Sequence, residues 1–326
     1  MMSKRPFDKE AAKAKVETLR KTVDDFASSI LSDTSGDIAF AKACDLARLP
    51  HPYSFGNLFL ITLQAGDSAL VASKTAFDKM AAEQGHAAVE FKNYDGTKRW
   101  KQHVRLAKGC SSITILAPCT FVKDKENDSG ETVKVPVHFF RGVGIFRAED
   151  VLYCDTLQPF EVPTLLGSVD AAEAPALMAS LLKFAEAKKI AVNRTAGLQA
   201  GNDGLSYGGF IEVRGGDTAA AVHPLIHELA HELLHPRSSR GAELSKKLAE
   251  SEAEATASTV LRALGYDTAL SSAYLRHHKV TPADVKQSLD RIVGAAQEIL
   301  VWLREGRIIH EEPVEDSGEI EVALVA

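Results

Sequence analysis

The chain has 326 residues, of which 45% are hydrophobic, and a formal net charge of -6. That length suits two hydrophobic cores of ordinary size rather than one, and the negative charge argues against a general nucleic-acid binder. No apolar run approaches the roughly 20 residues that span a bilayer, and no apolar stretch near the N-terminus could serve as a secretory signal. We therefore expect a cytoplasmic protein with no membrane partner.

Charge is distributed unevenly between the two halves of the chain. Residues 1–150 hold 22 Lys and Arg against 19 Asp and Glu, a net charge of +3, whereas residues 151–326 hold 16 against 25, a net charge of -9. The four cysteines form no CxxC pair, and we expect them to be reduced packing residues rather than a disulfide framework or a metal cluster: Cys44, Cys110, Cys119 and Cys154. A zinc ion would therefore have to be held by His and Glu.

The first half predicts a mixed α+β region. Apolar spacing predicts helices over residues 9–31, 38–46, 55–63 and 74–83, with a break at His51-Pro52. Strands are expected over residues 112–116, 133–140 and 143–146, with the polar residues 123–131 as a hairpin loop.

One stretch of the first half concentrates cations around a tryptophan: Lys98, Arg99, Trp100, Lys101, Arg105 and Lys108. Cations that track phosphates, beside an aromatic face on which unpaired bases stack, are what sequence-tolerant binding of single-stranded nucleic acid requires. A surface strand with solvated charges and with Trp100 turned into the core explains the same residues. The stretch alone favours this second interpretation.

The second half begins after an expected linker over residues 158–163, which gives domains at 1–160 and 164–308 and an acidic tail at 309–326 whose composition is typical of disorder. Asp170 is expected to cap a helix that ends at Ala187. Short strands over 190–192, 205–208 and 210–213 precede a helix over 222–234, and Thr281-Pro282 begins a last helix over 283–304.

The segment from His227 to His231 reads HELAH, an HExxH motif inside the helix expected over residues 222–234. Histidines four residues apart share one face of a helix, at about 5 to 6 Å between Cβ atoms, where two neutral imidazoles can bind one zinc ion. Glu228 points around the helix from that pair, so it could accept a proton from zinc-bound water instead of coordinating the metal. The motif predicts hydrolase chemistry, and two histidines on a solvated face by chance are the alternative.

A third ligand is expected from the helix that follows. If that helix buries the apolar stripe Ala253, Ala257, Val260, Leu261 and Leu264, then Glu250 extends the stripe by one turn toward the N-terminus. A carboxylate there needs a partner, and zinc supplies one. Glu254, one turn further on, would orient a ligand histidine. Glu252 falls on the opposite side of the helix and is the fallback ligand if the register differs.

Other residues near the motif are weaker candidates. Residues 204–208 match the G-x-S-x-G pattern of serine hydrolases, but Ser206 is followed by a strand rather than by the helix that such a nucleophile requires. We expect instead an edge strand beside the zinc site, where a peptide could pair with the backbone. His223 and His235 are expected to lie outside the ligand set. The hydroxyl that stabilises an oxyanion could come from any of three tyrosines: Tyr207, Tyr266 and Tyr274.

Two sets of motifs resemble known families. HELAH, followed by the E-x-x-A-E-x-x-A run that begins at Glu250, resembles the gluzincin-type metallopeptidase domain of the ImmA/IrrE group. In the first half, residues 53–61, Lys108-Gly109, residues 113–118 and residues 143–146 resemble, in that order, the N-terminal domain of ArdC-type antirestriction proteins. The resemblance runs from about residue 40 to residue 264.

The resemblance implies an α+β protein of two domains. The first, of mixed α+β structure, would bind single-stranded DNA. With this resemblance, DNA binding becomes the favoured interpretation of the basic stretch around Trp100, in place of a solvated strand. The second would be a mainly helical, gluzincin-like zinc metalloendopeptidase with a small sheet, acting on a protein substrate that the sequence does not identify. Its metal would be held by His227, His231 and Glu250, with Glu228 as general base.

The biological role that the resemblance implies is antirestriction, the protection of incoming mobile DNA. The principal alternative is a non-enzymatic DNA-protection or regulatory protein in which zinc is structural. A structural site is usually closed by four protein ligands and needs no adjacent general base, so Glu228 discriminates between the two hypotheses.

Overall fold

The computed structural model describes residues 9–32, 35–49, 51–66, 68–92, 98–126, 132–162, 173–198, 203–216, 219–236, 246–266, 268 and 281–308. Over these residues the fold is mixed α+β, as the sequence predicts. Within the same ranges, no helix combines the length and apolarity that crossing a membrane requires. The predicted acidic tail and the predicted helix cap at Asp170 lie outside the described residues.

Helices at the N-terminal end form close to the positions that apolar spacing predicts. They are α1 (Lys9–Ser32), α2 (Ser35–Asp45), the short 3-10 helix η1 (Leu46–Arg48), α3 (Phe55–Ala65) and α4 (Lys74–Glu83). The Phe26 ring of α1 stacks on Phe59 of α3, with ring centroids 3.7 Å apart. Ser54 caps α3, because its hydroxyl accepts a hydrogen bond from the Asn57 amide at 3.4 Å.

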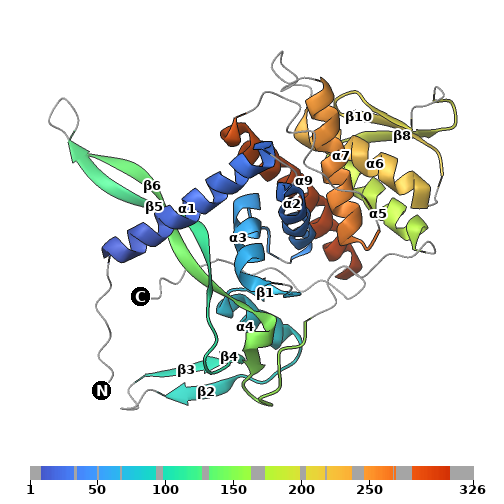
Figure 1. The fold of residues 1–326 in the computed structure, drawn as a ribbon. Coiled ribbons are helices and arrows are strands. Elements are labelled where there is room, and N and C mark those ends of the chain that lie inside the picture. Colours follow the sequence, from blue (N-terminus) through green and yellow to red (C-terminus); the bar gives the residue numbers. More distant parts are fainter. Residues whose placement is uncertain are drawn as a thin grey trace.

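The longest strands, β5 (Ile113–Glu126) and β6 (Thr132–Arg147), form an antiparallel ribbon against which α1 packs (Figure 1). The prediction of shorter strands with a loop from residue 123 is wrong, because pairing continues without a break to Glu126 and Thr132. Pro118 does not end the ribbon, since β5 is the end strand of the sheet β1-β6-β5, and an edge strand tolerates a missing N–H.

The other strands of the first half are short, and none of them was predicted individually from the sequence. They are β1 (Val71–Ala72), β2 (Val89–Lys92), β3 (Arg99–Gln102), β4 (Val104–Leu106) and β7 (Val151–Tyr153). β1 pairs with β6, β2 with β3, and β4 with β7, each antiparallel. The predicted basic stretch therefore lies on two successive short strands.

The second half follows the predicted order of elements. They are α5 (Ala174–Ala187), β8 (Ala191–Thr195), β9 (Gly204–Ser206), β10 (Phe210–Arg214), α6 (Ala219–Leu234), α7 (Lys246–Ala263) and α9 (Pro282–Ile308). α5 begins at Ala174, with a proline in its first turn. β10 pairs in parallel with β8 and antiparallel with β9, which lies at one end of this sheet.

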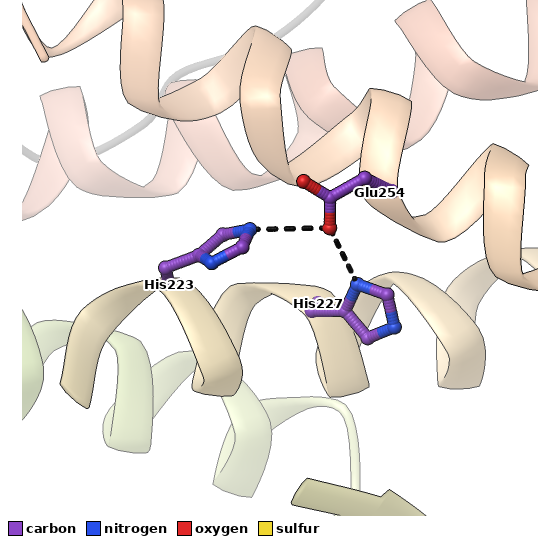
Figure 2. Close-up of side chains that lie close together, drawn as sticks. All are labelled: His223, His227 and Glu254. Atoms are coloured by element: carbon purple, nitrogen blue, oxygen red, sulfur yellow. Dashed lines mark hydrogen bonds and ion pairs between the residues drawn. The ribbon is translucent and has the colours of Figure 1, made fainter. Parts of the chain in front are cut away.

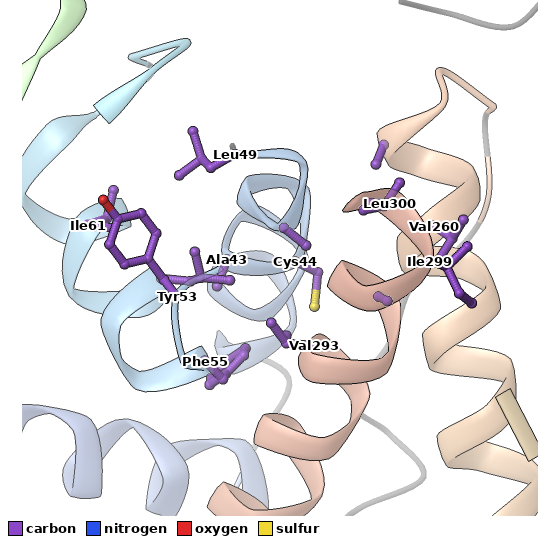
Figure 3. Packing of buried hydrophobic residues seen from close by; sticks show 14 of the residues in the cluster. Ala43, Cys44, Leu49, Tyr53, Phe55, Ile61, Val260, Val293, Ile299 and Leu300 are labelled. Atoms are coloured by element: carbon purple, nitrogen blue, oxygen red, sulfur yellow. The ribbon is translucent and has the colours of Figure 1, made fainter. Parts of the chain in front are cut away.

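One continuous cluster of buried apolar side chains runs through both halves of the chain. α9 packs against α1 and α3 on one side and against α5, α6 and α7 on the other (Figure 1). Figure 3 shows Cys44 and Phe55 of the first half near Val293 of α9, and Ile299 of α9 near Val260 of α7. Because α9 contacts both halves, the division into two domains stays a prediction.

The four cysteines are free, as expected. Burial raises the pKa of the Cys44 thiol to about 12. This thiol is therefore protonated at neutral pH and packs as an apolar group.

Candidate metal centre

Four histidines follow one side of α6 and its C-terminal end at intervals of four residues: His223, His227, His231 and His235. Their ring centroids are successively 6.3, 4.8 and 6.0 Å apart. The other sides of α6 bury apolar residues: Val222, Leu225, Ile226, Leu229 and Ala230. That burial fixes the rotation of the helix, which therefore presents a row of imidazoles toward α7.

Three potential ligand atoms converge between α6 and α7: Nε2 of His227, Nε2 of His231 and Oε2 of Glu250. The two nitrogens are 3.1 Å apart, and the carboxylate oxygen lies 3.3 Å from the nitrogen of His231 and 3.4 Å from that of His227. Ligands bonded at about 2.0–2.1 Å to a tetrahedral zinc ion lie about 3.3 Å from one another. The three side chains therefore already have the spacing of a metal site.

Glu254 contacts the outer nitrogen of a candidate ligand, as the sequence predicts. Its Oε2 lies 3.1 Å from Nδ1 of His227 and 3.2 Å from Nε2 of His223 (Figure 2). When Nδ1 of His227 donates its hydrogen to this carboxylate, Nε2 is left with a lone pair directed at the cluster. Such a carboxylate–histidine pair fixes the tautomer that a metal ligand needs. The contact of His223 was not predicted from the sequence, although the place of His223 in the four-residue histidine repeat could have indicated it.

The ionisation of the groups at this site differs from one side chain to the next. Burial, together with the neighbouring His227, lowers the pKa of His231 to about 4, so this imidazole is neutral at pH 7. Hydrogen bonds from His223 and His227 hold the pKa of Glu254 far below its usual range. For His227, burial acts to lower the pKa, but the hydrogen bond with Glu254 and the surrounding carboxylates outweigh it and raise the pKa. His231 is thus a neutral ligand and Glu254, outside the ligand trio, is a firmly ionised carboxylate, while a proton on His227 would compete with a metal ion.

Glu250 lies beside the histidine pair, as predicted, but the prediction that its side chain is buried is wrong. Its side chain is 50% exposed, whereas Glu252 is fully buried. Glu252 turns away from the cluster and accepts hydrogen bonds from Ser288 at 2.6 Å and from Arg291 at 2.5 Å, both on α9. Among the two glutamates, only Glu250 adjoins the histidine pair, so Glu252 is not available as the fallback ligand.

Glu228 occupies a buried position beside the small sheet, with 7% of its surface exposed. Its side chain packs against Gly204 of β9 so closely that a Cβ at position 204 would lie 2.5 Å from Cγ and 2.7 Å from Oε1. The carboxylate therefore depends on a glycine opposite it. Gly204 is a site residue that the sequence analysis considered only as part of the G-x-S-x-G pattern.

The G-x-S-x-G segment has a structural role. The Ser206 hydroxyl donates to Glu232 of α6, and the same carboxylate accepts hydrogen bonds from the Gly208 amide at 2.8 Å and the Gly209 amide at 2.5 Å. Both glycines have positive φ, 83° and 90°, in the tight turn between β9 and β10. Glu232 therefore fastens the edge strand to the helix that carries the histidines, a role that its position after HELAH did not signal.

The remaining candidates are mostly engaged elsewhere. His235 lies 3.4 Å from Oε2 of the buried Glu252 and is outside the cluster, as expected. The Tyr207 hydroxyl donates to Glu212 at 3.1 Å, while Tyr266 packs against the apolar core and Tyr274 lies outside the described residues.

The candidate DNA-binding stretch begins on the two-stranded β2–β3 ribbon and continues along β4, which pairs with β7. Trp100 is 41% exposed and stacks on Phe91 of β2, with ring centroids 6.2 Å apart, so the alternative in which Trp100 turns into the core is wrong. All five cations of the stretch are exposed: Lys98, Arg99, Lys101, Arg105 and Lys108. Side chains alternate along a strand, which places Arg99 and Lys101 on the face opposite Trp100. Arg99 also lies 3.6 Å from Glu90.

The described residues define a mixed α+β protein in which two packed helices bring two histidines and a glutamate together beside a small three-stranded sheet. No family model matches the chain, and no curated protein matches it. Two crystal structures of the antirestriction protein ArdC from plasmid R388 are similar to it. The metal-free structure is 19% identical, with a TM-score of 0.42 over 79% of this chain and 85% of ArdC. The Mn(II)-bound structure is 17% identical, with a TM-score of 0.44 over 88% of this chain and 97% of ArdC.

Proposed function

We propose that His227, His231 and Glu250 bind a divalent metal ion, with Zn2+ as the working metal. The observation that carries this proposal is the set of three mutual separations, 3.1, 3.3 and 3.4 Å, among their ligand atoms. Electron-rich atoms aimed at one point repel one another, and a cation at that point converts the repulsion into coordination. Two imidazoles with one carboxylate are a ligand set typical of catalytic zinc.

We further propose that the site hydrolyses peptides. When bound, the zinc ion supplies Lewis acidity, which polarises a carbonyl and makes water easier to deprotonate. Glu228 would accept the proton from that water and deliver it to the leaving amine. The half-exposed Glu250 leaves one side of the cluster open to solvent, which favours a catalytic site over a closed structural one.

The small sheet offers a means of positioning a substrate. β9 is the end strand of the sheet and contacts α6, and Gly204 within it faces Glu228. An extended peptide that added to β9 by backbone pairing would run beside the cluster. This arrangement selects for peptide conformation more than for particular side chains.

The proposed biological role is antirestriction, in which the chain binds single-stranded DNA through residues 98–108. The exposed Trp100, which stacks on the partly buried Phe91, and the exposed cations support DNA binding, and the sequence resemblance to ArdC-type proteins supports the role. ArdC itself is described as an antirestriction protein and has been crystallised with Mn(II).

Replacing Glu228 with Gln tests the peptidase. The variant should retain one equivalent of zinc, because Glu228 is not one of the proposed ligands, and should lose proteolysis by about 100-fold or more, because it has no general base. Metal content is measured after dialysis, and cleavage of unfolded protein substrates is measured with and without single-stranded DNA. Glu212→Gln, a change of the same kind on β10, is the control.

The outcomes separate the candidate functions. If the wild type and Glu228→Gln cleave alike on every substrate, the peptidase proposal fails. If both bind zinc and neither cleaves, the alternative of a non-enzymatic protein with a structural zinc ion is favoured. If neither binds a divalent metal, the metal-site proposal fails as well.

A further inference from the structure

The row of histidines on α6 extends beyond the three proposed ligands. Nε2 of His223 and Nδ1 of His227 both face a single oxygen of Glu254, at 3.2 and 3.1 Å (Figure 2). The three ligand atoms of His223, His227 and Glu254 all lie within 4.8 Å of one another. The chemistry of this set repeats that of the first cluster, with two imidazoles and one carboxylate.

We propose that His223, Glu254 and Nδ1 of His227 form a second site for a divalent cation, weaker than the first. The two sites would share the His227 ring, which presents Nε2 to His231 and Glu250 on one side and Nδ1 to His223 and Glu254 on the other. This inference goes beyond the proposed peptidase and has only His227 in common with it.

The second site is the more exposed of the two. Side-chain exposure is 43% for His223 and 52% for Glu254, whereas it is only 11% for His231 in the first cluster. Ligands that are already desolvated and held by packing lose less on binding a metal. The first cluster should therefore fill at low metal concentration, and the second only when the metal is in excess.

Loading the second site requires a proton to leave. With only the first site filled, Nε2 of His227 would bind the metal and Nδ1 would carry the hydrogen that faces Glu254 at 3.1 Å. A second cation replaces that proton, which passes to solvent, and the ring then bridges two cations as an imidazolate. The positive charge on both sides of the ring stabilises its negative charge. Glu254 changes at the same time from hydrogen-bond acceptor to metal ligand.

One consequence is that excess metal would alter the first site. Glu254 orients the ring of His227 when the second site is empty, and it can no longer accept that hydrogen bond once a cation lies between them. We expect a biphasic response in which low metal concentrations support activity and higher concentrations reduce it. His223→Ala should abolish the second phase without changing the first.

Metal counting on the full-length, metal-stripped protein tests the proposal without recourse to activity. The protein is dialysed against increasing Co(II), and bound cobalt is measured together with the visible absorption of each species. We expect two ions per chain in the wild type, with the second bound about 10-fold or more weakly. His223→Ala should bind one, with the affinity of the tight site changed by less than about 3-fold. His138→Ala, on the exposed β5–β6 ribbon, controls for loss of an unrelated surface histidine.

A wild type that saturates at one ion, or a His223→Ala variant that still binds two, overturns the second site and leaves the first intact. A wild type that binds no cobalt overturns both sites. A single ion lost in His223→Ala but retained in His231→Ala places the metal in the outer trio alone, which contradicts the proposed peptidase and the shared ring together. Because His223 is 43% exposed, its replacement should leave the metal-free melting temperature unchanged, and His223→Gln repeats the test if it does not.

Cu(II) supplies a second measurement. Two Cu(II) ions joined by one imidazolate couple their spins, so the electron paramagnetic resonance signal per copper should fall as the second equivalent is added to the wild type. In His223→Ala the signal per copper should stay constant. A constant signal in the doubly loaded wild type would mean that the ions do not share the His227 ring.

Discussion

Two candidate sites were predicted from short runs of chemically suggestive residues, and their surroundings in the fold differ. One lies at the α6–α7 interface and the other is centred on the β2–β3 ribbon. Between the helices, His227, His231 and Glu250 converge to separations of 3.1 to 3.4 Å. On the ribbon, Trp100 lies on one face, and its neighbours Arg99 and Lys101 lie on the other. A four-residue spacing on a helix gathers side chains, whereas adjacency on a strand separates them.

The difference also concerns what surrounds each group. Between the helices, the side chains are held in place by their surroundings. His231 is buried, and Glu254 contacts the ring nitrogen of His227 that faces away from the cluster. The ribbon has only two strands, and its cations are exposed; Arg99 has one ion pair, to the half-exposed Glu90 at 3.6 Å, which holds its side chain only weakly. Preorganisation is therefore expected at the metal centre, and adaptable contacts are expected at the ribbon.

The largest effect is expected from His231→Ala. Loss of a direct ligand should lower metal affinity by more than the roughly 10- to 100-fold that loss of an outer hydrogen-bonding partner costs. Competition against a chelator of known affinity measures this change. His235→Asn, one turn further along the same row, should retain the metal. Retention of full affinity by His231→Ala would mean that α6 does not supply the ligand pair.

The glutamates of α7 provide a matched pair of substitutions. Glu252→Ala removes a buried acceptor from Ser288 and Arg291 and should destabilise the metal-free protein by about 1.5–3 kcal/mol. Glu250→Ala should leave the metal-free protein as stable as the wild type, because the side chain is half exposed, and should weaken metal binding instead. Thermal melting with and without zinc measures both quantities. The reverse pattern would make Glu252 the ligand.

An intermediate effect is expected from Glu254→Gln. An amide in place of the carboxylate keeps the shape but weakens the interaction that orients His227, which should lower the affinity for the first metal ion by about 10- to 100-fold. Calorimetric titration with zinc measures it. An unchanged affinity would show that the ring of His227 is held in place without Glu254.

The smallest effects are expected on the ribbon. Trp100→Ala should weaken binding of a single-stranded oligonucleotide by about 1 kcal/mol, at the lower end for base stacking because one side of the ring is already stacked on Phe91. Arg99→Ala and Lys101→Ala should each make the DNA affinity less dependent on salt. The slope of the logarithm of the binding constant against the logarithm of salt concentration should change by about 1 if the residue contacts a phosphate. Fluorescence anisotropy at several salt concentrations measures both. If none of the three substitutions changes the oligonucleotide affinity or its salt dependence, this ribbon is excluded as the DNA-binding surface.

The helices were largely predictable because their signals are local. Apolar spacing located α1, α3, α4 and α6 to within a few residues, and the Thr281-Pro282 pair located the start of α9. There the Thr281 hydroxyl accepts a hydrogen bond from the Asp284 amide at 3.3 Å, as a cap should.

Features that depend on distant partners were not predictable. The position of Glu250 beside the histidines was predicted correctly, but its burial was not. Which side of α7 is buried depends on α9, whose Ser288 and Arg291 bind Glu252 from 36 and 39 residues further along the chain. The length of the β5–β6 ribbon was missed for a similar reason. Charged residues such as Lys123 and Asp124 are typical of a loop, yet continuous pairing keeps them in a strand. Gly204 acquires its importance only when Glu228 is placed opposite it.

Because Glu232 of α6 binds the end of β9 and the turn after it, β9 and the proposed metal ligands are held in a fixed relative position. Glu232 immediately follows His231, so the helix that carries the proposed metal ligands also holds the turn at Gly208 and Gly209. A peptide paired with β9 would then take its register from the same rigid body that fixes the ion. The position of the scissile bond would then be determined by its distance along the backbone from the residues paired with β9, more than by its neighbouring side chains. Proteins that can expose an extended segment would be the preferred substrates.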